Sequence, residues 1–437
     1  MTHRYPNAGC VMTRCVDADR GPNAKFALRR AIRAPAYMMK DKPEGARICG
    51  TWLASSTEDI AVKFSFSPEQ EEFRAAVRRF LADQSPTKEV RRLMETEAGW
   101  ERKGWQAINS ELGLCSVRIP EAMGGHGFGF GEHCIVLEEM GGALLCAPYF
   151  ASTVLGAGAI LNGASEVQQQ TLLPAIASGD TVATLAFTED NGRWDAAGTA
   201  LTATKSGGVY RLNGHKSFVL DGHTADLIVV LARAPGSSGE SGLSLFAVRG
   251  DATGLDRRSL ASMDQTRKLA RLGFDNVQAQ LLGDEGAAAL PFARTMVEAA
   301  VCLSSEMVGG AERLREDALA YAMMRMQFGR PIASFQAMKH KQADMLLEVE
   351  LAKSAAHFAA AALDDGDADV IATASLAKAC ASDTYLQTAI HAIQIHGGIG
   401  FTWDNDTHLW FKRAKSSEVL FGDANLHRER MMNHWAA

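Results

Sequence analysis

Three side chains between residues 325 and 336 have the types and spacing needed to hold a bound group that carries phosphates and a flat ring. Arg325, Phe328 and Gln336 occur in the run Arg-Met-Gln-Phe-Gly-Arg-Pro-Ile-Ala-Ser-Phe-Gln. Arginine is always charged and offers paired donors to a pyrophosphate. The phenylalanine ring can pack against an adenine or another ring system. The alternative is an arginine that only ends a helix beside a core phenylalanine.

A glycine-rich turn that could also contact a bound group follows further along the chain. It reads His396-Gly-Gly-Ile-Gly-Phe401 and is preceded by Gln394. Gly397, Gly398 and Gly400 fit a turn where the backbone must approach a bound group closely, because only glycine lacks a side chain there. His396 alone is more typical of a packed histidine than of a ligand, and no partner set for a metal accompanies it.

These residues need rigid elements to position them, and the hydrophobic spacing predicts mostly helices. Ser67-Pro-Glu-Gln70 is typical of a helix start, with serine as the N-cap and proline at the first helical position. Helices are predicted up to about residue 180 and again from about residue 291. Four apolar side chains after Gln70 repeat at helical spacing and predict one buried face: Phe73, Val77, Phe80 and Leu81.

Between residues 181 and 290 the hydrophobic period changes from about 3.6 to about 2, which predicts strands. The pair Asn213-Gly214 is the preferred pair for a tight hairpin turn. Leu227–Leu231 and Leu243–Val248 are typical of buried strands. A tight break at 329–331, before a helix that starts near Ser334, separates two of the later helices.

The run Gly124-Gly-His-Gly-Phe-Gly-Phe-Gly131 could suggest a nucleotide-binding loop. No apolar strand precedes it and the βαβ context is missing, so that signal is weak. A flexible turn between helices is the favoured interpretation.

Composition narrows the function classes. The net charge is -6 without a dense Lys/Arg patch, which argues against nucleic acid as a partner. No apolar run reaches the roughly 18 residues of a membrane span. The eight cysteines show no C-x-x-C pair and no zinc-type spacing, so we expect reduced thiols in a cytoplasmic protein and no metal site. Residues 1–62 are Arg-rich and aperiodic, and are interpreted as a disordered or mis-started extension.

Taken together, the Arg-x-x-Phe-Gly segment, the glycine-rich turn and the order of helices and strands resemble the acyl-CoA dehydrogenase family. The resemblance covers roughly residues 63 to 430. It implies an α+β, mostly α fold. An N-terminal helical domain is expected at 63–180, a central β-barrel-like domain at 181–290 and a C-terminal four-helix bundle at 291–437.

The resemblance implies FAD as the cofactor, held across a subunit interface. The residues expected to contact the FAD of a neighbouring subunit are Arg325, Phe328, Gln336, Gln394, Gly397, Gly398 and Gly400. A dimer or tetramer is therefore expected.

Thr188 lies in a segment, Ala-Phe-Thr-Glu-Asp-Asn-Gly-Arg-Trp-Asp, that is similar to the family segment Ala-x-Thr-Glu-Pro-x-x-Gly-Ser-Asp. The resemblance implies that Thr188 hydrogen-bonds the pyrimidine side of the isoalloxazine. Asp190 replaces the family proline and Trp194 replaces the serine. The alternative is a polar transition from strand to loop.

Phe218 takes the place of an aromatic residue that packs against the flavin ring in the family. Leu220 stands where members often carry a hydroxyl that bonds flavin N5. The loss of that hydrogen-bond donor should change the reactivity of flavin N5, the atom that accepts the hydride. It should not by itself abolish binding of the flavin. An aromatic residue in a strand is also common in a plain core.

The usual catalytic glutamate of the family is missing. Counted from the turn at Gly397, its position falls on Phe421, whose ring cannot accept the α-proton of a thioester. A subset of the family carries the base on the helix before the Arg-x-x-Phe-Gly motif, and that position falls on Ala299. Asp423 and Glu298, which lie close to these two positions in the sequence, are the candidate catalytic residues.

Three explanations stay open. Asp423 or Glu298 could act as a displaced base, although Glu298 needs a helix rotation of about 100°. The chain could instead be half of a mixed assembly in which a paralogous subunit supplies the base. The third explanation is a binding or structural role without catalysis.

The activity implied by the resemblance is α,β-desaturation of an acyl-CoA, with electrons passed to an electron-transfer flavoprotein. The expected assembly is a homo-oligomer or a heterotetramer with a paralogous subunit. The alternatives are a non-catalytic partner subunit and a flavin oxidase or oxygenase on the same fold, whose chemistry does not always need a carboxylate base.

Overall fold

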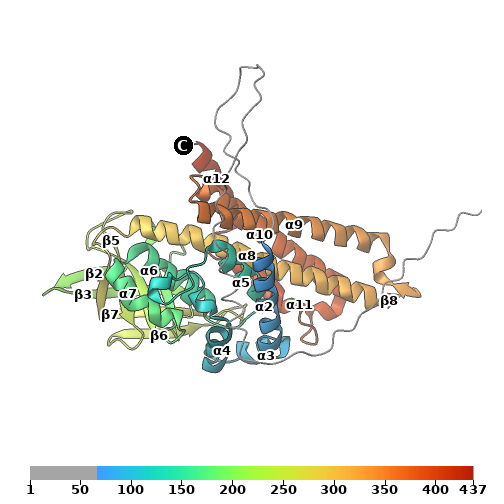
Figure 1. Ribbon diagram of the computed structural model, residues 1–437, viewed down its shortest axis with the longest axis horizontal. Helices are drawn as coiled ribbons and strands as arrows, with labels where there is room; N and C mark the ends of the chain where they lie inside the picture. The colour runs from blue at the N-terminus through green and yellow to red at the C-terminus, as the bar shows by residue number, and fades with distance from the viewer. Residues whose placement is uncertain (1–65, 437) are drawn as a thin grey trace, which may run out of the picture. The chain divides into compact units, whose positions relative to one another are not determined.

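The computed structural model describes residues 66–436, and Figure 1 shows how their elements follow one another. The extension expected at 1–62 lies outside the described residues. The N-terminal part of the described chain is helical. Its helices are α2 (Pro68–Gln84), α3 (Thr87–Met94), α4 (Arg102–Leu112), α5 (Phe130–Ala143), α6 (Ala157–Gly163) and α7 (Glu166–Ala177), with the short helical turns η1 (Leu114–Ser116) and η2 (Glu121–Met123) and the π-helical segment η3 (Phe150–Gly156).

Helix α2 begins as the sequence predicts. The Ser67 hydroxyl accepts a hydrogen bond from the Gln70 backbone at 3.2 Å, and the Gln70 side chain accepts one from the Ser67 backbone at 3.0 Å. The helix packs on α5 through the buried ion pair of Arg74 and Glu138, at 2.8 Å. Three of the predicted face residues are buried: Val77, Phe80 and Leu81.

The strands form one seven-stranded sheet that closes on itself. Strand β5 pairs with both β7 and β4, which completes the path β4-β2-β3-β7-β5, while β1 pairs with β4 and β6 with β7. The interior of this barrel-like sheet holds its own apolar core. The strands are β1 (Ala183–Ala186), β2 (Thr202–Ser206), β3 (Val209–Leu220), β4 (Leu227–Arg233), β5 (Leu243–Arg249), β6 (Leu255–Leu260) and β7 (Leu269–Leu282). The two buried strands predicted from the sequence are confirmed as β4 and β5.

The prediction of a hairpin turn at Asn213-Gly214 is wrong. Strand β3 runs through both residues, and the turn from β2 to β3 is made by Gly207 and Gly208, with φ of 60° and 83°. The pairing of β3 with β7 shifts register beside Gly214, and the Asn213 side chain accepts a hydrogen bond from the Asn276 backbone at 2.9 Å. The Asn-Gly pair therefore forms a β-bulge. A β-bulge, like a hairpin turn, favours residues with a flexible backbone.

Long helices return after the sheet and lie alongside one another (Figure 1). Helices α8, α9 and α10 pack on one another, α11 contacts α8 and α10, and α12 packs on α10. Their bounds are α8 (Ala289–Met324), α9 (Gln336–Asp365), α10 (Val370–His396), α11 (Thr407–Val419) and α12 (Ala424–Ala436). The predicted break between α8 and α9 is a small hairpin of β8 (Met326–Gln327) and β9 (Arg330–Pro331), followed by the turn η5 (Ile332–Ser334), and η6 (Gly397–Phe401) follows α10. The predicted fold class is thus confirmed.

The glycine-rich run at 124–131 leads from η2 into α5. Asp364, near the end of α9, accepts hydrogen bonds from the backbone of Phe130 at 2.7 Å and of Gly131 at 3.0 Å. The Asp364 carboxylate therefore already takes up backbone donors at this helix N-terminus, which a nucleotide-binding loop would offer to a phosphate. A Cβ added to Gly125 would lie 1.8 Å from the Ile119 carbonyl oxygen, so close packing requires glycine there.

Among residues 66–436, no helix combines the length and the apolar character needed to cross a membrane. The same residues contain no group of three or more His, Cys, Asp or Glu side chains placed to hold a metal ion. The five cysteines in this range are free thiols.

Candidate active site

Two neighbouring pockets are lined by residues of the β domain and of the helices. The larger pocket holds about 520 Å³ of empty space and the smaller pocket about 230 Å³, and both figures include space that is open to solvent. The larger pocket is lined by residues that include Phe150, Leu220, Asp221, Arg267, Glu306 and Arg413. The smaller pocket is lined by residues that include Thr188, Trp194, Phe218, Leu220, Leu420 and Phe421. Leu220 lines both pockets and so marks their common boundary.

A buried ion pair fixes the chain around Thr188 in the smaller pocket. Lys216 on β3 donates to the Glu189 carboxylate at 2.8 Å and to the Phe187 carbonyl at 2.9 Å. Burial lowers the pKa of Lys216 to about 8, against the opposing effect of Glu189. The Thr188 side chain is itself buried, and its hydroxyl finds no hydrogen-bond partner among residues 66–436. A hydroxyl held in this way can donate to a ligand.

Phe218 is presented to the smaller pocket by an irregularity in β3. The register of β3 against β7 shifts between Lys216 and Val219, and Phe218 has φ of 59°. A bulky residue rarely adopts positive φ, and such strain often accompanies a functional site. The Phe218 ring is 44% exposed, which leaves its face available for contact. The neighbouring Leu220 is buried and offers no donor.

Phe421 is the centre of a packed aromatic group. It is 2% exposed, stacks on Phe150 with ring centroids 5.9 Å apart and meets Trp194 edge-on at 5.9 Å. Lys378 of α10 donates to the Gly422 carbonyl at 3.0 Å and so holds the turn that carries Phe421. Phe421, where the sequence comparison expects the family glutamate, thus packs against aromatic rings beside the smaller pocket.

Neither candidate base lines either pocket. Glu298 is buried in α8, where its carboxylate pairs with Arg118 at 3.1 Å and accepts from Asn162 at 3.1 Å. Asp423 is exposed and accepts from the Leu426 backbone at 2.9 Å, as a cap at the start of α12. These contacts describe structural roles for both carboxylates, and their assignment as bases stays a prediction.

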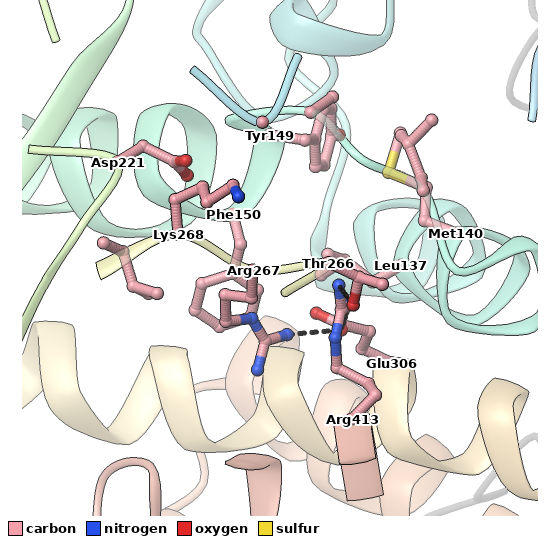
Figure 2. A pocket seen from close by; sticks show the side chains of 14 residues that line it. Leu137, Met140, Tyr149, Phe150, Asp221, Thr266, Arg267, Lys268, Glu306 and Arg413 are labelled. Atoms are coloured by element: carbon pink, nitrogen blue, oxygen red, sulfur yellow. Dashed lines mark hydrogen bonds and ion pairs between the residues drawn. The ribbon is translucent and has the colours of Figure 1, made fainter. Parts of the chain in front are cut away.

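The larger pocket contains a charged network that the sequence analysis missed (Figure 2). Arg413 of α11 donates to Asp264 at 2.9 Å, to Glu306 of α8 at 2.7 Å and to Thr266 at 2.7 Å. Arg267 also donates to Glu306, and both arginines and both carboxylates are buried. No sequence signal could have found this network, because its members come from a loop and two helices that are far apart in the chain.

Asp221 faces the same pocket and was also missed, although it directly follows Leu220. Its side chain is 9% exposed, and Figure 2 shows its carboxylate directed toward the other labelled residues. Burial raises the pKa of Asp221 to about 7, against the opposing effect of Arg267, Arg413 and Lys268. A buried carboxyl with such a pKa is characteristic of binding and catalytic sites.

This pKa predicts how Asp221 changes stability with pH. The ordinary value is 3.8 and the folded value is about 7, so between these values the unfolded chain binds fewer protons than the folded chain. The stability that the protonated carboxyl provides is complete below about pH 3.8 and is lost as the pH rises to about 7. The loss amounts to about 1.4 kcal/mol for each pH unit in this window.

The measurement is urea unfolding of the wild type and of Asp221→Asn at several pH values from about 5 to about 8. The stability of the wild type relative to the variant should fall up to about pH 7 and then level off. An Asp256→Asn control, at a side chain that is 58% exposed, reports the effect of removing a surface charge. A constant difference between wild type and Asp221→Asn would contradict the raised pKa.

The remaining predicted cofactor residues gather at the far end of α8, where they form the distal cluster. Phe328 is 89% exposed, and Arg325 is exposed beside it. Lys341 of α9 donates to Gln394 at 3.1 Å, which brings the end of α10 to the same place. The members of the distal cluster are Arg325, Phe328, Gln336, Gln394, Gly397, Gly398 and Gly400.

The distal cluster is separate from both pockets. From Glu306, in the larger pocket, to the end of α8 the helix rises by roughly 27 Å. None of the cluster residues lines either pocket. The structure therefore divides the predicted cofactor residues into two groups, with Thr188 and Phe218 in the smaller pocket and the others in the distal cluster.

Comparisons with known proteins agree with this architecture. The chain matches the acyl-CoA dehydrogenase N-terminal domain at 67–180, the middle domain at 184–277 and the C-terminal domain at 280–435. It is 30% identical to the acyl-CoA dehydrogenase IpdE2 of Mycobacterium tuberculosis, over 80% of this chain and 92% of that protein.

Two solved structures show the same fold. One is butyryl-CoA dehydrogenase from Megasphaera elsdenii, with 25% identity and a TM-score of 0.80, covering 86% of this chain and 100% of that one. The other is the ChsE4-ChsE5 complex from Mycobacterium tuberculosis, with 25% identity and a TM-score of 0.77, covering 86% of this chain and 99% of that one. With all three domains matched in order, the chain belongs to the acyl-CoA dehydrogenase family, a family of flavoprotein oxidoreductases.

Proposed function

We propose that this chain is an FAD-dependent acyl-CoA dehydrogenase subunit that takes part in the α,β-desaturation of an acyl-CoA thioester. The observation that carries the proposal is the smaller pocket, which both Thr188 and Phe218 line. Family membership supports the reaction class, and we assign the acyl group to the larger pocket, which adjoins the smaller one at Leu220.

The residues of the smaller pocket fit the ring system of FAD. An isoalloxazine has two flat faces and an edge of carbonyl and imide groups. The strained, half-exposed Phe218 ring offers a face, and the unpaired Thr188 hydroxyl offers a donor to the edge. Leu220 has no donor for flavin N5, so N5 would lack the side-chain hydrogen bond found in many relatives.

The distal cluster fits the phosphates and adenine of an FAD bound by a neighbouring subunit. Arg325 would pair with the pyrophosphate, and Phe328 would pack against the adenine or the ring system. The distal cluster is far along α8 from the two pockets of this chain. This distance supports the proposal that the cluster binds the FAD of a second subunit. Exposed apolar side chains in the same region are typical of a subunit interface: Met323, Met324, Leu347, Ile399 and Phe401.

When bound, FAD would supply the acceptor for the hydride that leaves the β-carbon of the substrate. Thr188 and Phe218 would orient the ring, while Leu220 and the aromatic residues around Phe421 would exclude water. The α-proton needs a carboxylate, and Phe421 cannot provide one. Asp423 and Glu298 stay candidates within this chain, and a paralogous subunit is the other source. Electrons would pass to an electron-transfer flavoprotein.

The proposal predicts that Arg325→Ala weakens FAD binding. The loss of a charge-assisted, paired hydrogen bond is expected to raise the dissociation constant about 10- to 100-fold. Flavin content is measured by visible absorption after purification, in this chain and in the complex with any co-purifying subunit.

Two variants control this measurement. Arg325→Lys keeps the charge but not the paired geometry, and an intermediate loss is expected. Lys339→Ala removes an exposed charge of α9 that is outside the distal cluster, and it should leave flavin content unchanged. Unchanged flavin content in Arg325→Ala, alone and in the complex, would rule out the assignment of the distal cluster.

A second candidate function is a non-catalytic subunit that completes the FAD site of a paralogue. The packing of Phe421 favours it, because the family base position is closed by aromatic rings. The structural relative described as the ChsE4-ChsE5 complex pairs two differently named chains. Anaerobic titration of the purified chain with acyl-CoAs separates the candidates. Bleaching of a bound flavin favours a subunit with its own base, whereas a colourless or unreactive protein favours the partner role.

A further inference from the structure

Asp221 is the one ionisable acid or base in the wall of the larger pocket whose side chain has neither a hydrogen bond nor an ion pair among the described residues. Its carboxylate receives no hydrogen bond and makes no ion pair within residues 66–436, although only 9% of the residue is exposed. The backbone amide of Asp221 bonds the Lys268 carbonyl at 3.0 Å, so the position of the residue is fixed. An unpaired, desolvated carboxylate is costly, and proteins seldom keep one in a pocket without a use.

The cations nearest to Asp221 are already committed to other groups. Arg267 donates to Ser417 at 3.0 Å as well as to Glu306. Lys268 donates to the Met94 carbonyl at 2.8 Å. Arg413 is shared among three acceptors, as described above. Each of these side chains therefore already donates to another group, and none makes a hydrogen bond or ion pair with Asp221 among residues 66–436.

These charges restrict the chemistry of a ligand that could satisfy Asp221. A cationic ligand would be repelled by the arginines and by Lys268, and an anionic ligand would be repelled by Asp221 wherever this carboxyl is ionised, above about pH 7. A plain hydrocarbon would exclude water from the carboxylate and provide no donor in return. A neutral hydrogen-bond donor, such as a hydroxyl, meets all three conditions.

We propose that the larger pocket selects an acyl-CoA whose acyl group carries a hydroxyl, and that this hydroxyl donates a hydrogen bond to Asp221. The inference rests on the proposed function, which places the acyl group in this pocket. Leu220 separates Asp221 from the smaller pocket, so the donor belongs to the acyl group and not to the flavin ring. Asp221 is thus a residue that determines substrate specificity.

The test compares matched ligands that differ only in the hydroxyl. Hexanoyl-CoA is compared with hydroxylated derivatives in which the hydroxyl moves one carbon at a time, from the fourth carbon to the chain end. Binding to the holoprotein is measured by isothermal titration calorimetry at about pH 8, where Asp221 is mostly ionised. The best hydroxylated derivative should bind about 10- to 100-fold more tightly than hexanoyl-CoA.

Variants then assign the preference to Asp221. The backbone φ of Asp221 is 48°, so glycine and asparagine are the substitutions that the fold accepts most readily. Asp221→Gly should remove the preference for the hydroxyl, whereas Asp221→Asn should reduce it. Asp256→Asn removes an exposed carboxylate that lines neither pocket and should leave the preference intact.

The outcomes separate this inference from the proposed function. Equal binding of hexanoyl-CoA and all its hydroxylated derivatives overturns the inference and leaves the acyl-CoA assignment in place. A preference that survives in Asp221→Gly also overturns it. No binding of any acyl-CoA would overturn the proposed function itself.

Discussion

Replacing Phe421 by glutamate is expected to destabilise the fold and not to restore a working base. The residue is 2% exposed, and its ring contacts Phe150, Phe187 and Trp194. Losing a buried aromatic ring costs about 3–5 kcal/mol, and a carboxylate in its place adds the cost of burying an unpaired charge. The expected result is a fall of at least about 3 kcal/mol in the free energy of unfolding.

The loss of stability is measured by urea unfolding, and the chemistry by anaerobic titration with acyl-CoA. Val419→Ala changes a side chain that is 52% exposed on the preceding turn, and an effect below about 1 kcal/mol is expected. Phe421→Ala separates the lost ring from the added charge. A stable Phe421→Glu protein whose flavin is reduced by an acyl-CoA would show that the aromatic group is no obstacle to a base at this position.

The fold class could be predicted because local and global signals agree along most of the chain. The capping box at Ser67 and the strands β4 and β5 are confirmed, since each depends on neighbouring residues and on one hydrophobic period. The prediction of a hairpin turn at Asn213-Gly214 was wrong because an Asn-Gly pair is also favourable in a β-bulge. The glycines at 207 and 208 meet the demands of the hairpin turn instead, and a local pattern cannot decide between the two uses.

Residues of the candidate site could be identified from the sequence only where they belong to a recognisable motif. Thr188 and Phe218 stand in recognisable segments, and the structure places both in one pocket. Asp221 and the network around Glu306 have no such signal, because their meaning comes from burial and from partners that are distant in sequence. The backbone strain at Phe218 is equally invisible in the sequence, since it follows from how β3 pairs with β7.

Glu306→Ala is the second substitution with a large expected effect. The Glu306 carboxylate accepts hydrogen bonds from both Arg267 and Arg413, and all three side chains are at most 8% exposed. Removing the Glu306 carboxylate leaves the guanidinium groups of Arg267 and Arg413 in the wall of the larger pocket without the acceptor that they share. Breaking a buried ion pair by removing one partner costs about 3–5 kcal/mol, chiefly because the remaining charge stays desolvated. We expect a loss of this size in urea unfolding, measured at fixed protein concentration because oligomers unfold in a concentration-dependent way.

A matched control lies on the same helix. Asp317 pairs with Arg313 at 2.8 Å, but these side chains are 40% and 47% exposed, so Asp317→Ala should cost less than about 1 kcal/mol. Glu306→Gln keeps the shape of the side chain and removes the charge, and most of the loss should persist if charge pairing is the cause. If Glu306→Gln were as stable as the wild type, shape alone would explain the position. The network would then be a set of hydrogen bonds that tolerates a neutral acceptor, and the positive charge around Asp221 would have to be compensated by another group in the pocket.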